Sequence, residues 1–167
     1  MLGAYTHPDG LASTKAQKQM KTGKQLAYTC YQMYARSKSG LSPEYVSFTD
    51  AKGGDFVKGR DAPYYILRPE AAETFFILYH LTKDPVYREW GWEVFQAIEE
   101  HCRTHSGFSA IRDVDSMEKE NRMESFFMAE TLKYLYLLQD DTHQLDLLNK
   151  VSNKQALFMA WNSFYVA

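Results

Sequence analysis

Hydrophobic residues recur at helical spacing in four stretches of the chain, and polar residues separate these stretches. The predicted helices span residues 14–40, 69–82, 85–107 and 123–138. In the first, Leu26, Cys30 and Met33 fall on one stripe with lysine-rich positions opposite, so this stripe is expected to face the core. The last is apolar almost all round, which predicts burial on most sides.

Short extended segments and loops are predicted between the helices. Residues 41–48 are predicted to be a turn that leads into a short extended segment, and residues 64–67 and 108–111 are predicted to be short extended segments. Polar and glycine-rich composition predicts exposed loops at residues 49–63 and 112–122, and the tail at residues 142–167 is weakly patterned.

One pattern occurs twice with an offset of 57 residues (129 − 72). The first copy is Ala72-Glu73-Thr74 with Leu78, Tyr79, Leu81 and Asp84; the second is Ala129-Glu130-Thr131 with Leu135, Tyr136, Leu138 and Asp141. Stacked helical hairpins produce repeats of this kind. The repeat therefore favours an all-α helical toroid or solenoid over a closed bundle.

The junction Arg68-Pro69-Glu70 leads from a predicted extended segment into a predicted helix. Proline suits the first turn of a helix and disfavours a helical conformation in the residue before it. Glu70 and Glu73 therefore fall in the opening turn on one face, with Arg68 just outside. Such a carboxylate pair beside a guanidinium can act as a general base, a ligand for a hard cation or a clamp on sugar hydroxyls. The simpler alternative is helix capping by acidic residues.

The composition is that of one globular domain. Of 167 residues, 45% are hydrophobic, 24% charged and 15% aromatic, which fits large buried faces and also carbohydrate stacking. A net charge of −2 gives no reason to expect a nucleic-acid or anionic-membrane partner. The chain shows neither a signal-peptide pattern nor a run that could span a bilayer, so taken literally it is expected to be cytosolic.

Further carboxylates lie at predicted structural breaks. Glu44 follows Pro43, and Glu124 stands at the head of the last predicted helix. A carboxylate at the start of a buried helix needs N–H groups, a cation or a ligand to satisfy its charge. An acidic cup without clustered histidine or cysteine favours Ca²⁺ over zinc, and two carboxylates with a water suffice for inverting glycoside hydrolysis.

Four segments in order along the chain resemble the class I α-1,2-mannosidases, glycoside hydrolase family 47. They are residues 65–70 (YILRPE), 87–93 (YREWGWE), 107–114 (GFSAIRDV) and 125–138 (SFFMAETLKYLYLL). The resemblance implies an (α/α)7 barrel, of which residues 1–167 would form the C-terminal part as a partial barrel with short β-hairpins. It also implies inverting, Ca²⁺-dependent trimming of α-1,2-linked mannose from N-glycans in the endoplasmic reticulum or Golgi.

The resemblance also implies roles for particular residues. Glu70 matches the proposed general base, and Arg68, Glu73, Glu44 and Glu124 match residues of an acidic cup that contacts mannose or orders water around calcium.

The tail departs from the family's pattern. Where the family has a threonine that ligates Ca²⁺, this chain has Lys154, and Gln155 replaces an acid. An ammonium opposes a bound cation, so no intact metal site is expected. Residues 142–167 are accordingly interpreted as a divergent tail.

The helices that carry the family's general acid have no counterpart in these residues, so the chain alone is expected to be inactive. Two alternatives remain: a non-catalytic glycan-binding or interaction remnant, or a gene read incompletely. Any membrane attachment would come only through the family's N-terminal anchor, which is missing here. Because part of a barrel leaves apolar faces uncovered, self-association is also expected.

Overall fold

The computed structural model describes residues 1–5, 7–50 and 55–141 of the chain. Its helices are α1 (Leu2–Tyr5), the 3-10 helix η1 (Gly10–Ala12), α2 (Thr14–Ala35), α3 (Glu70–Thr82), α4 (Val86–Cys102), the π-helix η2 (Phe127–Leu132) and α5 (Lys133–Gln139). Its strands are β1 (Val46–Phe48), β2 (Phe56–Lys58), β3 (Arg103–Thr104), β4 (Gly107–Phe108), β5 (Ala110–Asp113) and β6 (Glu118–Glu120). They pair as three antiparallel two-stranded hairpins, so the predicted helix-rich fold with short hairpins is confirmed.

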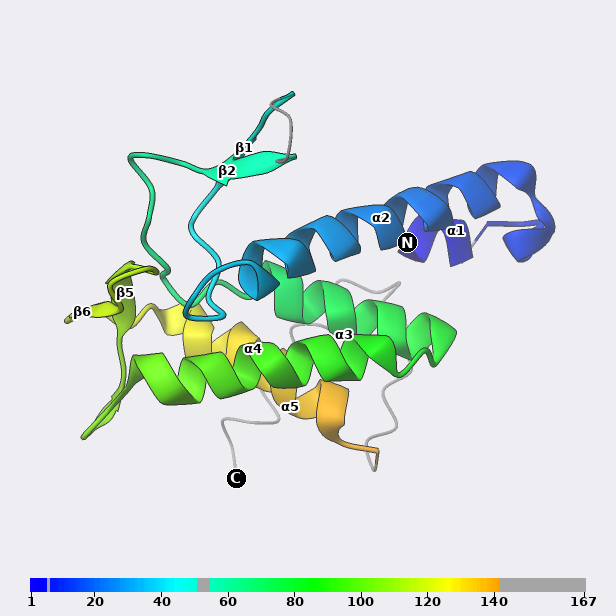
Figure 1. Cartoon of the computed structure of the whole chain (residues 1–167). Helices are drawn as coiled ribbons and strands as arrows, with labels where there is room; N and C mark the ends of the chain where they lie inside the picture. Colours follow the sequence, from blue (N-terminus) through cyan, green and yellow to red (C-terminus); the bar gives the residue numbers. More distant parts are fainter. Residues whose placement is uncertain (6, 51–54, 142–167) are drawn as a thin grey trace.

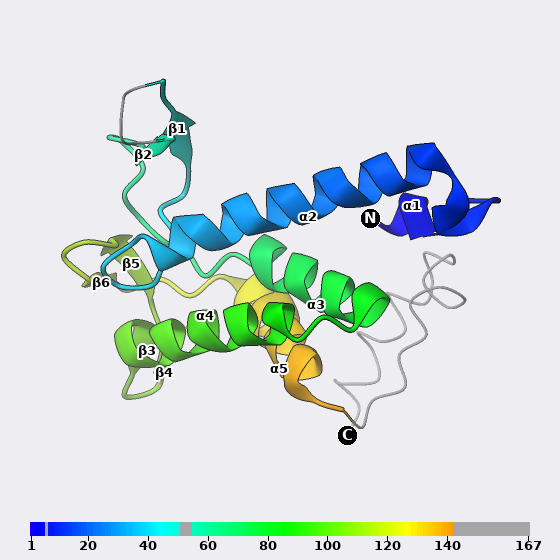
Figure 2. The same ribbon diagram turned by 45° about the vertical axis from the view of Figure 1, so that its right-hand side comes forward.

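The helix α3 lies at the centre of this arrangement and contacts α2, α4 and α5 (Figures 1 and 2). Its side chains Phe75 and Leu78 are fully buried. Trp90 of α4 meets Phe75 edge-on, with ring centroids 5.6 Å apart, and Tyr31 of α2 stacks on Trp90 at 4.5 Å. These aromatic contacts join three helices, so the start of α3 is held by a packed core.

The boundaries of α3 and α4 follow the predicted signals. The helix α3 begins directly after Pro69 and ends at Thr82, and Lys83 then adopts a left-handed conformation with φ 57°. The Asp84 carboxylate accepts a hydrogen bond from the Val86 amide at 3.2 Å and so caps α4. That helix ends at Cys102 rather than near residue 107, because the next residues turn back as the β3–β4 hairpin.

The predicted buried stripe of α2 is wrong at Leu26, whereas Cys30 and Met33 are partly buried. Leu26 is 63% exposed, and the helix ends at Ala35 rather than near Gly40. The buried residues of α2 are Ala16, Met20, Ala27 and Tyr34. Small alanines allow neighbouring backbones to approach, so the contact face follows side-chain size as well as hydrophobicity.

The predicted strand at residues 64–67 is also wrong. Only Tyr65 pairs, in an isolated antiparallel bridge with Ile111, and Leu67 has a φ of 66° that breaks an extended strand. The predicted loops at 49–63 and 112–122 contain the strands β2 and β6, whose three-residue sequences are too short to show an alternating pattern.

The last helix starts at Ser125 and includes the π turn of η2 before it continues as α5. Met123, Met128 and Tyr136 are about half exposed or more, so the predicted burial on most sides is wrong. The buried side of this helix carries Phe127, Thr131, Tyr134, Leu135, Leu137 and Leu138.

The two copies of the 57-residue repeat form neighbouring elements. The helices α3 and α5 contact each other, and Leu78 and Leu135, which occupy equivalent repeat positions, are both buried. Over the described residues the helices do not close into a barrel. None of the described helices has the length and apolar character that crossing a membrane requires. The tail at residues 142–167, with Lys154, lies outside the described residues.

Candidate active site

The lead-in segment, residues 63–69, carries Arg68 to the start of α3. At one end the Pro63 carbonyl accepts a hydrogen bond from the Val114 amide at 2.8 Å. In its middle, Tyr65 and Ile111 exchange two backbone hydrogen bonds, each 2.8 Å long. The β5–β6 hairpin therefore supports this segment through its backbone.

Arg68 and Glu44 form a charged pair at the end of the lead-in segment. The Arg68 Nε lies 2.8 Å from Glu44 Oε1 and 2.9 Å from Oε2, and a terminal guanidinium nitrogen also donates to Oε1. The Glu44 side chain is only 17% exposed and that of Arg68 42%. The hydrogen bond to Glu44 raises the pKa of Arg68 above its ordinary value. The guanidinium is therefore a fixed positive charge at this site.

Glu70 lies on the other side of the guanidinium. Its carboxylate is 3.6 Å from a terminal nitrogen of Arg68 and 66% exposed. Pro69 is the N-cap of α3 and offers no side-chain cap, and the Glu73 amide bonds to the Pro69 carbonyl at 2.9 Å. A helix N-terminus favours negative charge, and here that charge stays open to solvent. The Glu70 carboxylate can therefore contact water or a ligand while it stays next to Arg68.

Glu73 lies one turn further along α3 and contacts the last helix. The buried Tyr134 hydroxyl donates to Glu73 Oε1 at 3.3 Å. Burial is the main cause that raises the pKa of Tyr134, and the neighbouring Glu73 adds to it. Tyr134 is therefore a neutral donor that orients the Glu73 carboxylate.

Glu124 is held separately, immediately before the last helix. It forms an ion pair with Arg122, and its side chain is 26% exposed. The Glu124 carbonyl accepts a hydrogen bond from the Phe127 amide at 3.0 Å, which starts the following turn.

The structure thus joins some of the predicted site residues and not others. It brings Glu44, Arg68 and Glu70 into direct contact, and it places Glu73 on the next turn of α3. Among the described residues, no hydrogen bond or ion pair joins Glu124 to that group. Sequence reasoning missed Tyr134 and Arg122, although a tyrosine in an otherwise apolar helix signals a hydroxyl that needs a partner.

One feature that many metal sites have, a cluster of metal-binding side chains, is absent from the described residues. Within residues 1–5, 7–50 and 55–141, no three aspartate, glutamate, histidine or cysteine side chains are grouped so that they could hold a metal ion. The expected ligand position, Lys154, lies outside this part of the chain. The predicted loss of the metal site stays a prediction.

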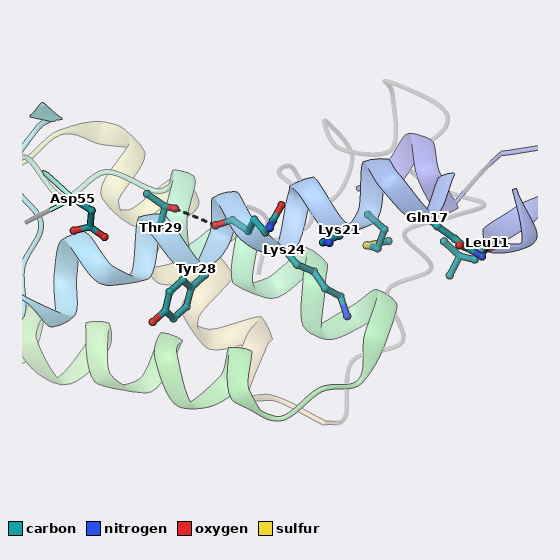
Figure 3. A pocket seen from close by; sticks show the side chains of 9 residues that line it. Leu11, Gln17, Lys21, Lys24, Tyr28, Thr29 and Asp55 are labelled. Carbon is teal, nitrogen blue, oxygen red and sulfur yellow. Dashed lines mark hydrogen bonds between the residues drawn. The ribbon is translucent and has the colours of Figure 1, made fainter. Parts of the chain in front are cut away.

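A hollow elsewhere on the molecule runs along α2 and contains none of the predicted site residues (Figure 3). Leu11, Lys21, Lys24, Tyr28 and Asp55 are among the residues that line it. Tyr28 is 52% exposed, and Leu26, elsewhere on α2, is also exposed. Self-association of the chain stays a prediction, and these residues are where it would be sought.

Comparison with known proteins decides the family. The model of "Glycosyl hydrolase family 47" matches residues 2–160. The chain belongs to glycosyl hydrolase family 47. Among its relatives, "Mannosyl-oligosaccharide alpha-1,2-mannosidase IA" of Drosophila melanogaster is 44% identical over 157 residues, which cover 93% of this chain and 23% of the fly protein.

Other relatives in family 47 agree with this assignment. "Mannosyl-oligosaccharide 1,2-alpha-mannosidase IC" of Homo sapiens is 46% identical over 134 residues, which cover 79% of this chain and 21% of the human protein. A solved structure, "alpha-1,2-mannosidase from Trichoderma reesei", is similar with a TM-score of 0.70 at 33% identity. The match covers 77% of this chain and 30% of the Trichoderma chain. The chain thus spans about a quarter of the length of the curated relatives it matches.

Proposed function

We propose that this family 47 chain is part of an α-1,2-mannosidase that trims mannose from oligomannose N-glycans, with Glu70 as the general base. The observation that carries the proposal is the contact of Glu44, Arg68 and the solvent-open Glu70 at the start of α3. It occurs in a chain that is 44% identical to a protein named as an α-1,2-mannosidase.

In the proposed step, Glu70 accepts a proton from a water molecule whose oxygen attacks C1 of the terminal mannose. The bond between C1 and the glycosidic oxygen breaks, and that oxygen takes a proton from a general acid outside these residues. The attack comes from the face opposite the leaving group, so the configuration at C1 inverts. Arg68 offers donors to sugar hydroxyls while Glu44 holds its guanidinium in place.

The remaining site residues are assigned to sugar binding. Glu73 is oriented by Tyr134 and can accept hydrogen bonds from mannose hydroxyls or from ordered water. Glu124 would take the same role from the head of the last helix. Its ion pair with Arg122 fixes its position.

The wider architecture and location are part of the same proposal. The contact of α3 with α5, the two repeat helices, supports a place for this chain in an (α/α)7 barrel whose other helices complete the cup. A relative from Schizosaccharomyces pombe, 38% identical over 150 residues, is named as an endoplasmic reticulum mannosidase, which supports a secretory-pathway location.

The chain alone is proposed to be inactive and not to hold calcium. Hydrolysis with inversion needs an acid as well as a base, and Lys154 opposes a cation where the resemblance implies a ligand. A glycan-binding role without hydrolysis is the second candidate. Two observations favour it: the Glu44–Arg68 pair is complete, and the sequence has a lysine at position 154 where the resemblance implies a calcium ligand.

The proposal is tested with a chimaera in which residues 41–141 replace the matching segment of the fly mannosidase. Because the fly protein supplies the remaining helices and its own tail, the chimaera isolates the contribution of Glu70. We expect it to release mannose from α-1,2-mannobiose and Glu70→Gln to lower that rate about a thousandfold. The matched control is Glu100→Gln, which alters an exposed carboxylate of α4 and should leave the rate unchanged.

A cooperatively folded chimaera that releases no mannose contradicts the proposed activity. If such a chimaera binds the disaccharide without cleaving it, the glycan-binding alternative is supported instead. Equal rates for Glu70→Gln and Glu100→Gln contradict the assignment of Glu70 as the base.

A further inference from the structure

The backbone just before Arg68 is held by a buried side chain from the last helix. The Thr131 hydroxyl donates to the carbonyl oxygen of Leu67 at 2.7 Å across 64 residues of sequence. Both residues are fully buried, with 0% exposure. Water therefore cannot replace this hydrogen bond, and the Leu67 carbonyl depends on Thr131 for a partner.

Leu67 adopts a conformation that leucine disfavours. Its φ is 66°, in the left-handed region where the side chain crowds the backbone. A residue stays there only when its surroundings enforce it. The buried side chain and the hydrogen bond from Thr131 supply that enforcement. The peptide that follows Leu67 leads directly into Arg68, so the direction of the guanidinium depends on this one backbone rotation.

The π turn of the last helix places Thr131 for this contact. A π turn contains one more residue than an α turn, so the side chains that follow it are rotated about the helix axis. Such turns are rare in proteins, and many of those that occur lie at functional sites. Here the turn spans Phe127–Leu132, begins shortly after Glu124 and contains Thr131. The same helix therefore connects Glu124 at its head with Leu67 in the lead-in segment.

We propose that Thr131 is a positioning residue for the active site. Its hydroxyl holds Leu67 in the left-handed conformation and so aims Arg68 between Glu44 and Glu70. The structural part of this inference is independent of the reaction, whereas its effect on turnover rests on the proposed function.

The structural part is tested on the 167-residue chain by NMR of the Arg68 Nε–Hε group. In the native chain we expect a resolved, slowly exchanging signal because Glu44 accepts this hydrogen. Thr131→Val keeps the shape of the side chain but removes the donor, and should speed hydrogen exchange at Arg68 about fivefold to tenfold. Thr82→Val is the matched control. It also removes a threonine hydroxyl that donates to a backbone carbonyl at 2.7 Å, here that of Leu78, and it lies at the far end of α3.

A second pair of variants covers the case in which valine disturbs folding. Thr131→Ser and Thr131→Ala both lack the methyl group and differ only in the hydroxyl. Serine should keep the native Arg68 signal and alanine should change it as valine does. An Arg68 signal that is the same in the serine and alanine variants would overturn the proposal, whatever happens to the melting temperature.

The effect on turnover is measured in the chimaera that contains residues 41–141. Thr131→Val should lower kcat about 10- to 100-fold, because small misplacements of catalytic groups have effects of this size, and should change KM much less. An inactive parent chimaera would contradict the proposed function and leave the NMR result standing. An active parent whose Thr131→Val variant keeps the native kcat would overturn the positioning role.

Discussion

Arg68 donates from Nε to both carboxylate oxygens of Glu44, at 2.8 and 2.9 Å, although 24 residues separate the two in the sequence. The chain between them forms the β1–β2 hairpin, whose base is also closed by a hydrogen bond from the Glu44 amide to the Ala62 carbonyl at 3.2 Å. The pair therefore joins the hairpin to the start of α3. It serves the fold as well as the site.

Replacement of Glu44 by glutamine should destabilise the chain. Glutamine removes the charge, and the Arg68 guanidinium is only 42% exposed, so solvent compensates for the lost partner in part. We expect the free energy of unfolding to fall by about 1–2 kcal/mol in urea denaturation. The control is Glu99→Gln, which removes an exposed pair with Arg103 and should cost at most about 0.5 kcal/mol. Equal losses for the two variants would contradict the role given to Glu44.

Gly91 lies where α4 and the last helix come close together. A Cβ atom at this position would overlap the Leu138 side chain, which is fully buried and cannot move aside freely. Gly91→Ala should therefore destabilise the chain by about 1–2 kcal/mol despite the higher helix propensity of alanine.

A double-mutant cycle checks this explanation. In a Leu138→Ala background the overlap disappears, so Gly91→Ala should become neutral or stabilising. Gly23→Ala is a further control, because its new methyl group would meet only the flexible side chain of Met1. If Gly91→Ala costs the same stability in the native and Leu138→Ala backgrounds, the overlap with Leu138 is not the cause of the loss.

The two cysteine thiols should differ in reactivity. Cys102 is fully buried, and burial raises its pKa to about 12, while Cys30 is partly exposed and its pKa is raised less far. Because the thiolate is the reactive form, iodoacetamide at pH 8 should label Cys30 in the folded chain and reach Cys102 only on unfolding. Peptide mass spectrometry identifies the labelled thiols. Rapid labelling of both thiols without denaturant would contradict the burial of Cys102 in the core.

The same raised pKa makes stability depend on pH. The folded chain holds the Cys102 proton more tightly than the unfolded chain, whose thiol titrates near 9.0. This contribution to stability is fully present below about pH 9 and is lost as the pH rises toward the folded-state pKa. Urea midpoints should therefore fall between pH 9 and 11, and the fall should be smaller in Cys102→Ala.

Lys154 should prevent calcium binding. Isothermal titration of the 167-residue chain with CaCl₂ is expected to show no binding, because the ammonium repels the cation. A Lys154→Thr variant tests whether the remaining ligand groups assemble in this chain. Heat of binding in the native chain would contradict the predicted loss of the metal site.

The sequence predicted the centre of the molecule better than its edges. The starts of α3 and α4 were predictable because Pro69 and Asp84 act locally, through a fixed φ and a carboxylate cap. Short strands such as β2 and β6 form only when a distant partner aligns, and three residues carry too little periodicity to reveal it. The exposure of Leu26 likewise depends on which neighbours α2 meets.

In the candidate site, too, local features could be predicted from the sequence and long-range contacts could not. The sequence placed Glu70 and Glu73 on the opening turn of one helix, because a helical spacing is sufficient for that inference. The contact of Glu44 with Arg68 depends on closure of a hairpin, and the donors Tyr134 and Thr131 come from a helix more than 60 residues away with a π turn. The sequence signals that the Tyr134 hydroxyl needs a partner, but it does not indicate which residues make these contacts.

The proposed role of Glu70 is to activate water for attack on the face of mannose opposite the leaving group. The most direct measurement is proton NMR of the first sugar that the chimaera releases from an α-1,2-linked mannose disaccharide, recorded before the product mutarotates. Attack by water with inversion should produce β-mannose first, and Glu70→Gln should suppress that signal. If α-mannose appears first, or if the Glu70→Gln chimaera produces β-mannose at the parent rate, the account is wrong.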